Sequence, residues 1–229
     1  MKKSVIYLVL FLFAVVSAGA QKTFQGTVTY TYEVKGDNAE MMKSMMPQSM
    51  IIKYGDESMM TEMKGGMMAS MMGKIIVNGK AGEAFVVQDA QKSVYVMKLD
   101  EQQVEQADVK EVTEMDEQKE ILGYDCQRYK MIMTQNGQEM TQYMWVTKEL
   151  KAPEIKAPGL QQMGGAMANG KIPGFPMSTE VSIPGMNATM IMTVSDLNFD
   201  KVPANTFDRP KDYTVKDFEE LMKMGGMGN

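Results

Sequence analysis

Apolar and polar side chains alternate strictly over residues 24–34, and this pattern constrains the fold more than any other feature of the chain. Apolar residues or glycine hold the even positions from Phe24 to Val34, while Thr, Gln or Glu holds the odd positions from Thr23 to Glu33. A period of two places the two sets on opposite faces of a β-strand. The pattern therefore predicts a strand with one buried face and one solvated face.

Six further runs are interpreted in the same way, because β-branched and aromatic residues are frequent in them. They span residues 83–89, 93–99, 124–134, 139–147, 177–183 and 188–199. Asn136-Gly137 separates two of these runs, and Asn-Gly favours a type I′ hairpin turn because both central positions need a positive φ. Pro184-Gly185 separates the last two runs and suits a type II turn. These connections predict an antiparallel meander.

Three segments interrupt the strand pattern. Residues 38–46 are predicted to form a short helix. Asp37 or Asn38 can cap its start, its methionines are four positions apart, and Pro47 ends it. Residues 151–175 are rich in Pro, Gly and Ala and are interpreted as a long loop with a short helix. Residues 215–224 precede Gly225-Gly226 and are predicted to form a C-terminal helix.

Two more segments fit no single period. In residues 59–73, Met59, Thr61 and Met63 alternate as in a strand, whereas the methionines after Gly65-Gly66 return to helical spacing. Residues 108–120 alternate charged residues with occasional apolar ones, which is typical of a solvated edge or loop. The sequence leaves the structure of residues 59–73 open.

The first twenty residues have the form of a secretory signal peptide. Lys2 and Lys3 precede an apolar run, and Ala18-Gly19-Ala20 suits cleavage before Gln21. The run is shorter than the roughly 18–20 residues that a membrane-spanning helix needs, and no cysteine stands at the cleavage site to carry a lipid. We therefore expect an exported protein, periplasmic or secreted, without a stable membrane anchor.

The mature chain has the length of one β-rich domain. We expect residues 21–213 to form it, followed by a C-terminal helix and a flexible Gly/Met tail over residues 214–229. Without Lys2 and Lys3 the chain has 22 basic and 29 acidic residues, a net charge of about −7. The basic residues are not clustered, so nucleic acid is not an expected partner.

The chain contains no histidine and a single cysteine, Cys126. A Ser-His-Asp or Cys-His catalytic arrangement is therefore impossible, and no nucleotide-binding motif is present. In an alternating strand Cys126 shares a face with Tyr124 and Arg128, which favours a buried structural thiol. We expect a protein that is not an enzyme and uses no cofactor.

Methionine is the most unusual component, with 28 residues in the chain, and its pairs concentrate between Met41 and Met72. One interpretation is structural: methionine replaces the scarce leucine as core filler. A second is an adaptable apolar binding surface, since flexible thioether side chains fit ligands of variable shape. For this surface the candidate lining is Met41, Met42, Met45, Met46, Met163, Met167, Met190 and Met192.

A third interpretation is a soft-metal site, because thioether sulfur binds Cu(I) and helical spacing puts sulfurs on one face. The residues for this alternative are Met59, Met63, Met67, Met68, Met71 and Met72. The missing imidazoles disfavour zinc or Cu(II). A role of exposed methionines as an oxidation sink is also open.

The order of several short motifs resembles a known family. An N-terminal strand is followed by ILGYDCQRYK (121–130), a hairpin into MWVTKEL (144–150), a Gly/Pro-rich insertion and VPANTFDRPKDY (202–213). This arrangement resembles the exported bacterial domain of unknown function 4412 family, which is similar to the periplasmic lipoprotein carriers. The resemblance implies a mainly β fold, an antiparallel open half-barrel with a few short accessory helices. It also implies binding of a lipid, a lipoprotein acyl chain or another apolar molecule in the cell envelope, with an apolar small molecule or a lipidated protein as partner.

Overall fold

The computed structural model describes residues 21–37, 39–97, 108–135, 137–155, 172–183 and 187–224. Within these ranges the main feature is one open, 12-stranded sheet in which the two edge strands, β14 (Thr214–Asp217) and β8 (Asp108–Ile121), do not pair with each other. None of the helices in these ranges is long and apolar enough to cross a bilayer. The predicted fold class, an open and mainly antiparallel β-sheet with short helices, is confirmed.

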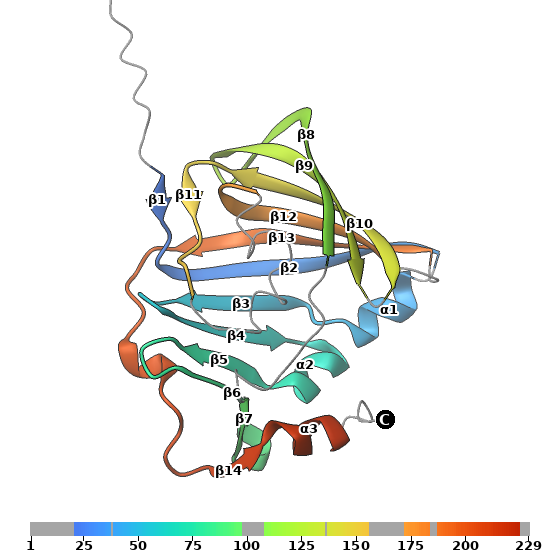
Figure 1. Ribbon diagram of the computed structural model, residues 1–229. Coiled ribbons are helices and arrows are strands. Elements are labelled where there is room, and N and C mark those ends of the chain that lie inside the picture. Colours follow the sequence, from blue (N-terminus) through green and yellow to red (C-terminus); the bar gives the residue numbers. More distant parts are fainter. Residues whose placement is uncertain are drawn as a thin grey trace, which may run out of the picture.

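The sheet consists of two meanders that meet at β2 and β13 (Figure 1). The first contains β2 (Gly26–Gly36), β3 (Ser49–Tyr54), β4 (Ser58–Lys64), β5 (Lys74–Asn78), β6 (Glu83–Gln88) and β7 (Ser93–Met97). The second contains β8, β9 (Tyr124–Gln135), β10 (Gln138–Thr147), β12 (Phe175–Ile183) and β13 (Ala188–Asn198). Pairing of β2 with β13 joins segments that are about 160 residues apart, such as Val34 and Met190. A small parallel pair, β1 (Lys22–Thr23) with β11 (Leu150–Lys151), lies outside this sheet.

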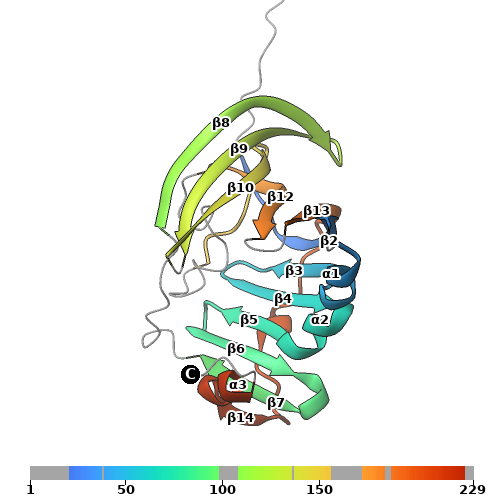
Figure 2. The ribbon, with the colours of Figure 1, turned by 90° about the vertical axis from the view of Figure 1, so that its right-hand side faces the viewer.

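The second meander is strongly curved, and its strands β8 to β10 arch over the rest of the sheet (Figure 2). Register shifts occur in the pairs β8–β9 and β10–β12 and in the β13–β2 junction. The extra residue at such a bulge bends the strand and increases its twist. Within the described strands, the pairings from β2 to β7 contain no such shift. The curvature is therefore concentrated where the bulges are.

Strand register assigns each side chain to one of two faces. Directly paired residues share a face, so Tyr30, Met50 and Val194 lie on one side and Thr31, Ser49 and Thr193 on the other. We call the first the helix face, because α1 (Ala39–Met45) and α3 (Phe218–Met224) pack on it. Together with α2 (Gly66–Met72) they lie at the right-hand ends of the strands in Figure 1.

The opposite face of the first meander is covered by the segment that follows β13. Phe207 in the short 3₁₀ helix η4 (Ala204–Phe207), together with Val202, packs against Met60, Ile76 and Phe85. A second 3₁₀ turn, η1 (Asp89–Gln91), connects β6 to β7. Strands β5 to β7 are thus buried on both sides, which explains the continuous buried run Ala84–Gln88 in β6.

One end of the helix face is fully buried by aromatic side chains. Phe24 lies 5.1 Å from Phe175 and 5.9 Å from Tyr54 between ring centroids, and Tyr54 lies 6.3 Å from Phe175. Tilted and edge-on pairs of this kind stabilise by about 0.5–1.5 kcal/mol each beyond their buried area. Burial raises the pKa of the Tyr54 hydroxyl, so the ring stays neutral. These contacts tie β1, β3 and β12 together.

The structure confirms most predicted elements. Each of the seven runs predicted as strands contains a strand, and the described part of the 38–46 helix is α1. The hairpin at Asn136-Gly137 is confirmed by the pairing of Gln135 with Gln138. Residues 59–73 divide as their mixed periods indicate, with β4 before and α2 after Gly65. The proposed signal peptide lies outside the described residues. So do residues 156–171, which contain the short helix expected within residues 151–175.

The structure decides one alternative, corrects one helix boundary and adds two strands. Of the two alternatives for residues 108–120, the solvated edge is confirmed, because β8 pairs with β9 as an edge strand of the sheet. The C-terminal helix begins at Phe218 and not at Val215, because Thr214–Asp217 pair in parallel with β7. Strands β3 and β5 were not predicted, since Ile51-Ile52 and Ile75-Ile76-Val77 are continuous apolar runs without alternation.

Candidate apolar binding site

A row of half-buried apolar side chains crosses the helix face near α1. Register places Met190 beside Val34, Met192 beside Tyr32, and Met50 beside Met63. All of these except Val34 are neither fully buried nor fully exposed. We call this set the methionine row: Met50, Met63, Met190, Met192 and Tyr32.

The methionine row differs from the two ends of the same face. Toward β1 the face is closed by the aromatic contacts of Phe24 and Tyr54. Toward the far edge Ile75 and Tyr95 are covered by Phe218 and Leu221 of α3. Between these regions the four thioethers of the row remain partly accessible.

Polar atoms in the methionine row are few. The Tyr32 hydroxyl donates to Met50 Sδ at 3.5 Å, and burial raises the pKa of this hydroxyl. A hydroxyl that donates to a thioether makes a weak hydrogen bond and retains its capacity to accept one. The row therefore offers soft, polarizable surface with one polar group, the composition that suits an apolar chain with a polar end.

Helix α1 forms one wall beside the row. Its Met42 is buried against Val34 and Ala188, and Met46 packs on the same cluster from the turn that follows the helix. The other side of α1 carries Met41 and Met45, whose residue surfaces are 61% and 48% exposed. The methionines of α1 are thus divided between the sheet and solvent.

Two glycines allow α2 to lie directly against α1. Gly66 has a φ of +68°, and a Cβ there would stand 2.1 Å from the Met46 carbonyl oxygen. Gly65 has a φ of +72°, and its Cβ would stand 2.7 Å from the Gln48 side chain. Only glycine combines a left-handed backbone with so close an approach. Gly65-Gly66 therefore fixes how the two methionine-rich helices meet.

The predicted lining residues separate into three groups. Met190 and Met192 lie in the methionine row, with Met42 and Met46 in the neighbouring α1 wall. Met41 and Met45 face solvent. Met163 and Met167 lie outside the described residues. Met50, Met63 and Tyr32 were not predicted to line the site. The alternation of Met59 and Met63 was a usable signal, but alternation shows only which residues share a face of the strand. It does not show which face is accessible.

Among the residues proposed for Cu(I), those whose side chains the structure describes lie in different surroundings. Met59 and Met63 are four strand positions apart, about 13 Å at the usual rise, and Met59 packs against the aromatic end of the core. Met67 is 60% exposed on α2 and Met72 is half-buried. The side chains of Met68 and Met71 are outside the described part of the structure. Within the described ranges no group of three or more Asp, Glu or Cys residues is arranged to hold a metal ion.

Cys126 has the surroundings of a structural thiol. It is 2% exposed and packs in the same cluster as Trp145 and Phe175. Its thiol donates to the Tyr124 carbonyl oxygen at 3.3 Å, and burial raises the pKa of the thiol to about 11. The protonated form is therefore retained at neutral pH, and this agrees with the role expected from the sequence.

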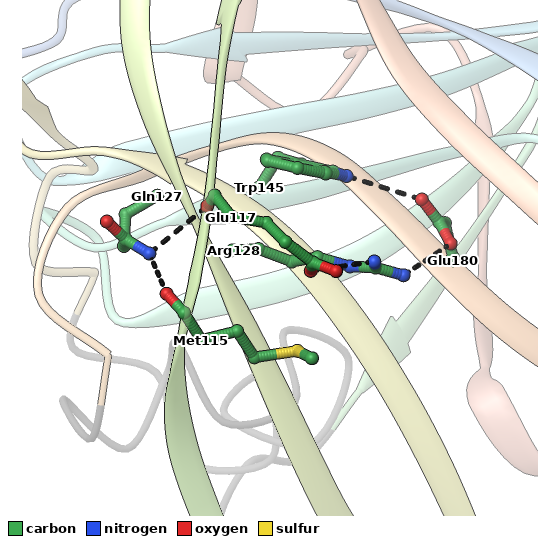
Figure 3. A network of polar contacts seen from close by, with 6 residues as sticks. All are labelled: Met115, Glu117, Gln127, Arg128, Trp145 and Glu180. Atoms are coloured by element: carbon green, nitrogen blue, oxygen red, sulfur yellow. Dashed lines mark hydrogen bonds and ion pairs between the residues drawn. The ribbon is translucent and has the colours of Figure 1, made fainter.

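A polar cluster that the sequence did not indicate joins strands β8, β9, β10 and β12 of the second meander (Figure 3). Glu180 accepts from Trp145 Nε1 at 3.3 Å and pairs with Arg128 at 3.4 Å. Arg128 also pairs with Glu117 at 2.8 Å, and Gln127 donates to the backbone carbonyls of Met115 and Glu117. Lys119 Nζ lies 4.2 Å from the centre of the Trp145 ring. The cluster holds the bulged part of β8 onto β9, β10 and β12.

A separate pocket of about 400 Å³ lies where η4 meets the ends of β3 and β5 and the start of β4. Tyr54 and Phe207 contribute apolar surface, and Asp56 accepts hydrogen bonds from Gln25 and Lys80. Lys201 and Asp208 add one charge of each sign. Its mixed lining, unlike the methionine row, has no dominant chemical character.

The fold and this face define a class of protein: an open antiparallel sheet whose helix face carries a partly accessible apolar strip beside short helices. The chain belongs to the family described as Domain of unknown function (DUF4412), whose model matches residues 38–213. This confirms the resemblance inferred from the motifs between Ile121 and Tyr213. No curated protein matches the sequence.

Several solved structures are similar to this chain. The structure of PNGF-II shares 15% identity over 86% of this chain, with a TM-score of 0.44, and the match covers only 32% of that longer protein. An uncharacterized conserved protein from Thermus thermophilus shares 10% identity, with 84% of this chain and 91% of that chain covered and a TM-score of 0.43. A putative outer membrane lipoprotein-sorting protein domain from Vibrio parahaemolyticus shares 12% identity over 80% of this chain and 89% of that chain, with a TM-score of 0.32. At these identities and scores the similarities carry no information about activity.

Proposed function

We propose that this protein is a non-catalytic binding protein that holds an apolar chain, such as a lipid or lipoprotein acyl chain, along the methionine row. The observation that supports the proposal is the half-buried state of Met50, Met63, Met190 and Met192 on one face beside α1. Burial of apolar surface contributes about 25 cal/mol per Å², so a strip several side chains long provides useful affinity. Flexible thioethers also tolerate ligands of differing shape.

A charge placed in the row tests this proposal. We expect Met192→Lys to weaken binding of an apolar fluorescent probe by more than about tenfold, because an apolar ligand would have to desolvate an unpaired ammonium group. Ile191→Lys is the matched control, since Ile191 is also half-buried but pairs with Glu180 and Glu33 on the opposite face. Equal probe binding by the two variants, or no binding by the unmodified protein, would contradict the proposal.

We further propose that the protein acts outside the cytoplasm after removal of residues 1–20. The basic start, the short apolar run and Ala18-Gly19-Ala20 support this location. Intact-mass measurement of the protein from fractionated cells tests it, with a mature chain beginning at Gln21 as the expected result. An unprocessed chain found only in the cytoplasm would count against it.

A further inference from the structure

Three exposed methionines belong to the neighbouring helices α1 and α2. Met41, Met45 and Met67 are 61%, 48% and 60% exposed, while the core methionines Met131 and Met177 are fully buried. We call these three residues the surface methionine trio. None of the three belongs to the cluster in which Met42 packs against Val34 and Ala188.

The backbone brings the trio together. Met41 and Met45 are four residues apart in α1, so their Cβ atoms are about 5–6 Å apart on the same side of the helix. Gly66, the first residue of α2, is so close to the end of α1 that an added Cβ would stand 3.1 Å from the Met45 carbonyl oxygen. Met67 follows directly. Its long side chain, with three rotatable bonds, is therefore within reach of Met45.

The chemistry of the trio is specific to sulfur. At a buried position methionine can serve as adaptable filler, but at an exposed helical position a leucine would supply the same apolar area and no worse helix propensity. What methionine adds there is a soft, uncharged electron-pair donor. Three thioethers match the ligand preference of Cu(I), and the chain has no histidine to recruit Cu(II) or zinc.

The single thiol of the chain does not compete for this ion. Cys126 lies on β9, buried with Trp145 and Phe175, and its protonated form is favoured. The charged residues of α1, Glu40 and Lys43, pair with each other at 2.5 Å.

We propose that the surface methionine trio binds one soft monovalent cation, Cu(I), through the sulfurs of Met41, Met45 and Met67. The site takes Met67 from the residues considered in the sequence and adds two residues that had been assigned to an apolar pocket. Binding changes no oxidation state and releases no proton, because thioethers are neutral ligands. The site is distinct from the methionine row, which lies on the inner side of α1.

The test compares metal uptake by three proteins. The first is the full mature chain, the second carries M41L, M45L and M67L, and the third carries M97L, M115L and M140L as a control with the same number of thioethers removed. Leucine is close to methionine in volume, so both triple variants keep their packing. Ag(I) replaces Cu(I) in parallel experiments as a soft cation without redox chemistry.

Uptake is measured by native mass spectrometry and by competition with a chelator under reducing, oxygen-free conditions. We expect one ion per chain for the unmodified protein and the control, and an affinity lower by more than about tenfold for the M41L/M45L/M67L variant. In parallel, three methionine methyl NMR resonances should shift on addition of Ag(I) and be missing from that variant. Equal affinity of all three proteins, or no ion retained against a weak chelator, would overturn the proposal. Binding of an apolar probe should be the same in all three, so this result and the test of the methionine row are independent.

Discussion

Arg128 on β9 and Glu180 on β12 form an ion pair across the intervening strand β10, with 3.4 Å between Nη2 and Oε2. The guanidinium lies over the rings of Tyr143 and Trp145 on β10, at 4.6 and 5.4 Å from their centres. The second carboxylate oxygen of Glu180 accepts from Trp145. Three strands of the curved meander are therefore fastened by one charged pair and one indole.

We expect Glu180→Gln to lower the free energy of unfolding by about 1–3 kcal/mol, because a mostly covered guanidinium loses part of its compensation. Both side chains are about three-quarters covered. Glu139→Gln, which breaks the exposed Lys110–Glu139 pair, should change stability by less than about 1 kcal/mol. Urea unfolding followed by Trp145 fluorescence measures both variants. Equal effects of the two substitutions would show that the Arg128–Glu180 pair contributes no more to stability than an exposed ion pair.

The approach of α2 to α1 depends on Gly66. Alanine at this position must adopt a φ near +68° and also place its Cβ 2.1 Å from the Met46 carbonyl oxygen. Gly82→Ala is the matched control, since Gly82 has a φ of +67° with nothing within 4 Å. We expect Gly82→Ala to lower the free energy of unfolding by about 1 kcal/mol, because of the left-handed backbone alone. Gly66→Ala should lower it by more than about 2 kcal/mol. Thermal unfolding of both variants measures these losses. Similar losses for Gly66→Ala and Gly82→Ala would rule out the close contact at Gly66.

Cys126 should be nearly inert toward thiol reagents in the folded protein. With a pKa of about 11, only about a thousandth of the thiol is ionised at pH 8, whereas an ordinary cysteine is about a quarter ionised there. We expect slow labelling by an aromatic disulfide reagent at pH 8 and rapid labelling in denaturant. Fast labelling of the native protein would contradict the burial of Cys126. Because the folded pKa is raised, the thiol favours folding below its ordinary pKa and loses this contribution as the pH rises toward 11.

Asp89 links three parts of the first meander at the turn between β6 and β7. It accepts from Lys74 on β5 at 2.6 Å and from the Tyr213 hydroxyl at 3.0 Å. The hydrogen bond from Lys74 is the main cause that lowers the pKa of the Asp89 carboxyl, and the hydrogen bond from Tyr213 adds to it. A lowered folded pKa contributes stability above the ordinary pKa of an aspartate, near 4, and this contribution is lost as the pH falls through the folded value.

The Asp89→Asn variant should therefore be less stable than the unmodified protein at pH 7, by about 0.5–1 kcal/mol, because the Asp89 side chain is half exposed. At a pH below the lowered pKa of Asp89 the two proteins should be equally stable. Urea unfolding at pH 7 and in acid measures the difference. A difference of the same size at both pH values would mean that the charge of Asp89 is not involved.

Local patterns predicted the elements whose residues alternate or carry turn signals. The strand around Val28 and Tyr30, the hairpin at Gly137 and the helix before Pro47 follow from side-chain period and backbone preference, which act within a few residues. Strands β3 and β5 escaped because both of their faces are apolar or covered, so no alternation appears in Ile51-Ile52 or Ile75-Ile76. Residues 214–217 were misassigned because their partner, β7, lies about 120 residues earlier.

For the candidate sites, the sequence by itself determined the chemistry: thioether side chains in excess, no imidazole and one thiol. Tertiary structure decided how those side chains are used. Pairing of β13 with β2 puts Met190 and Met192 on the helix face, and the contact of Gly66 with Met46 brings Met67 toward Met45 on the surface. These arrangements join positions distant along the chain, and they are set by strand register and close backbone packing rather than by local preference. Adjacent residues such as Met41 and Met42, identical in the sequence, therefore acquire different environments, one facing solvent and the other the core.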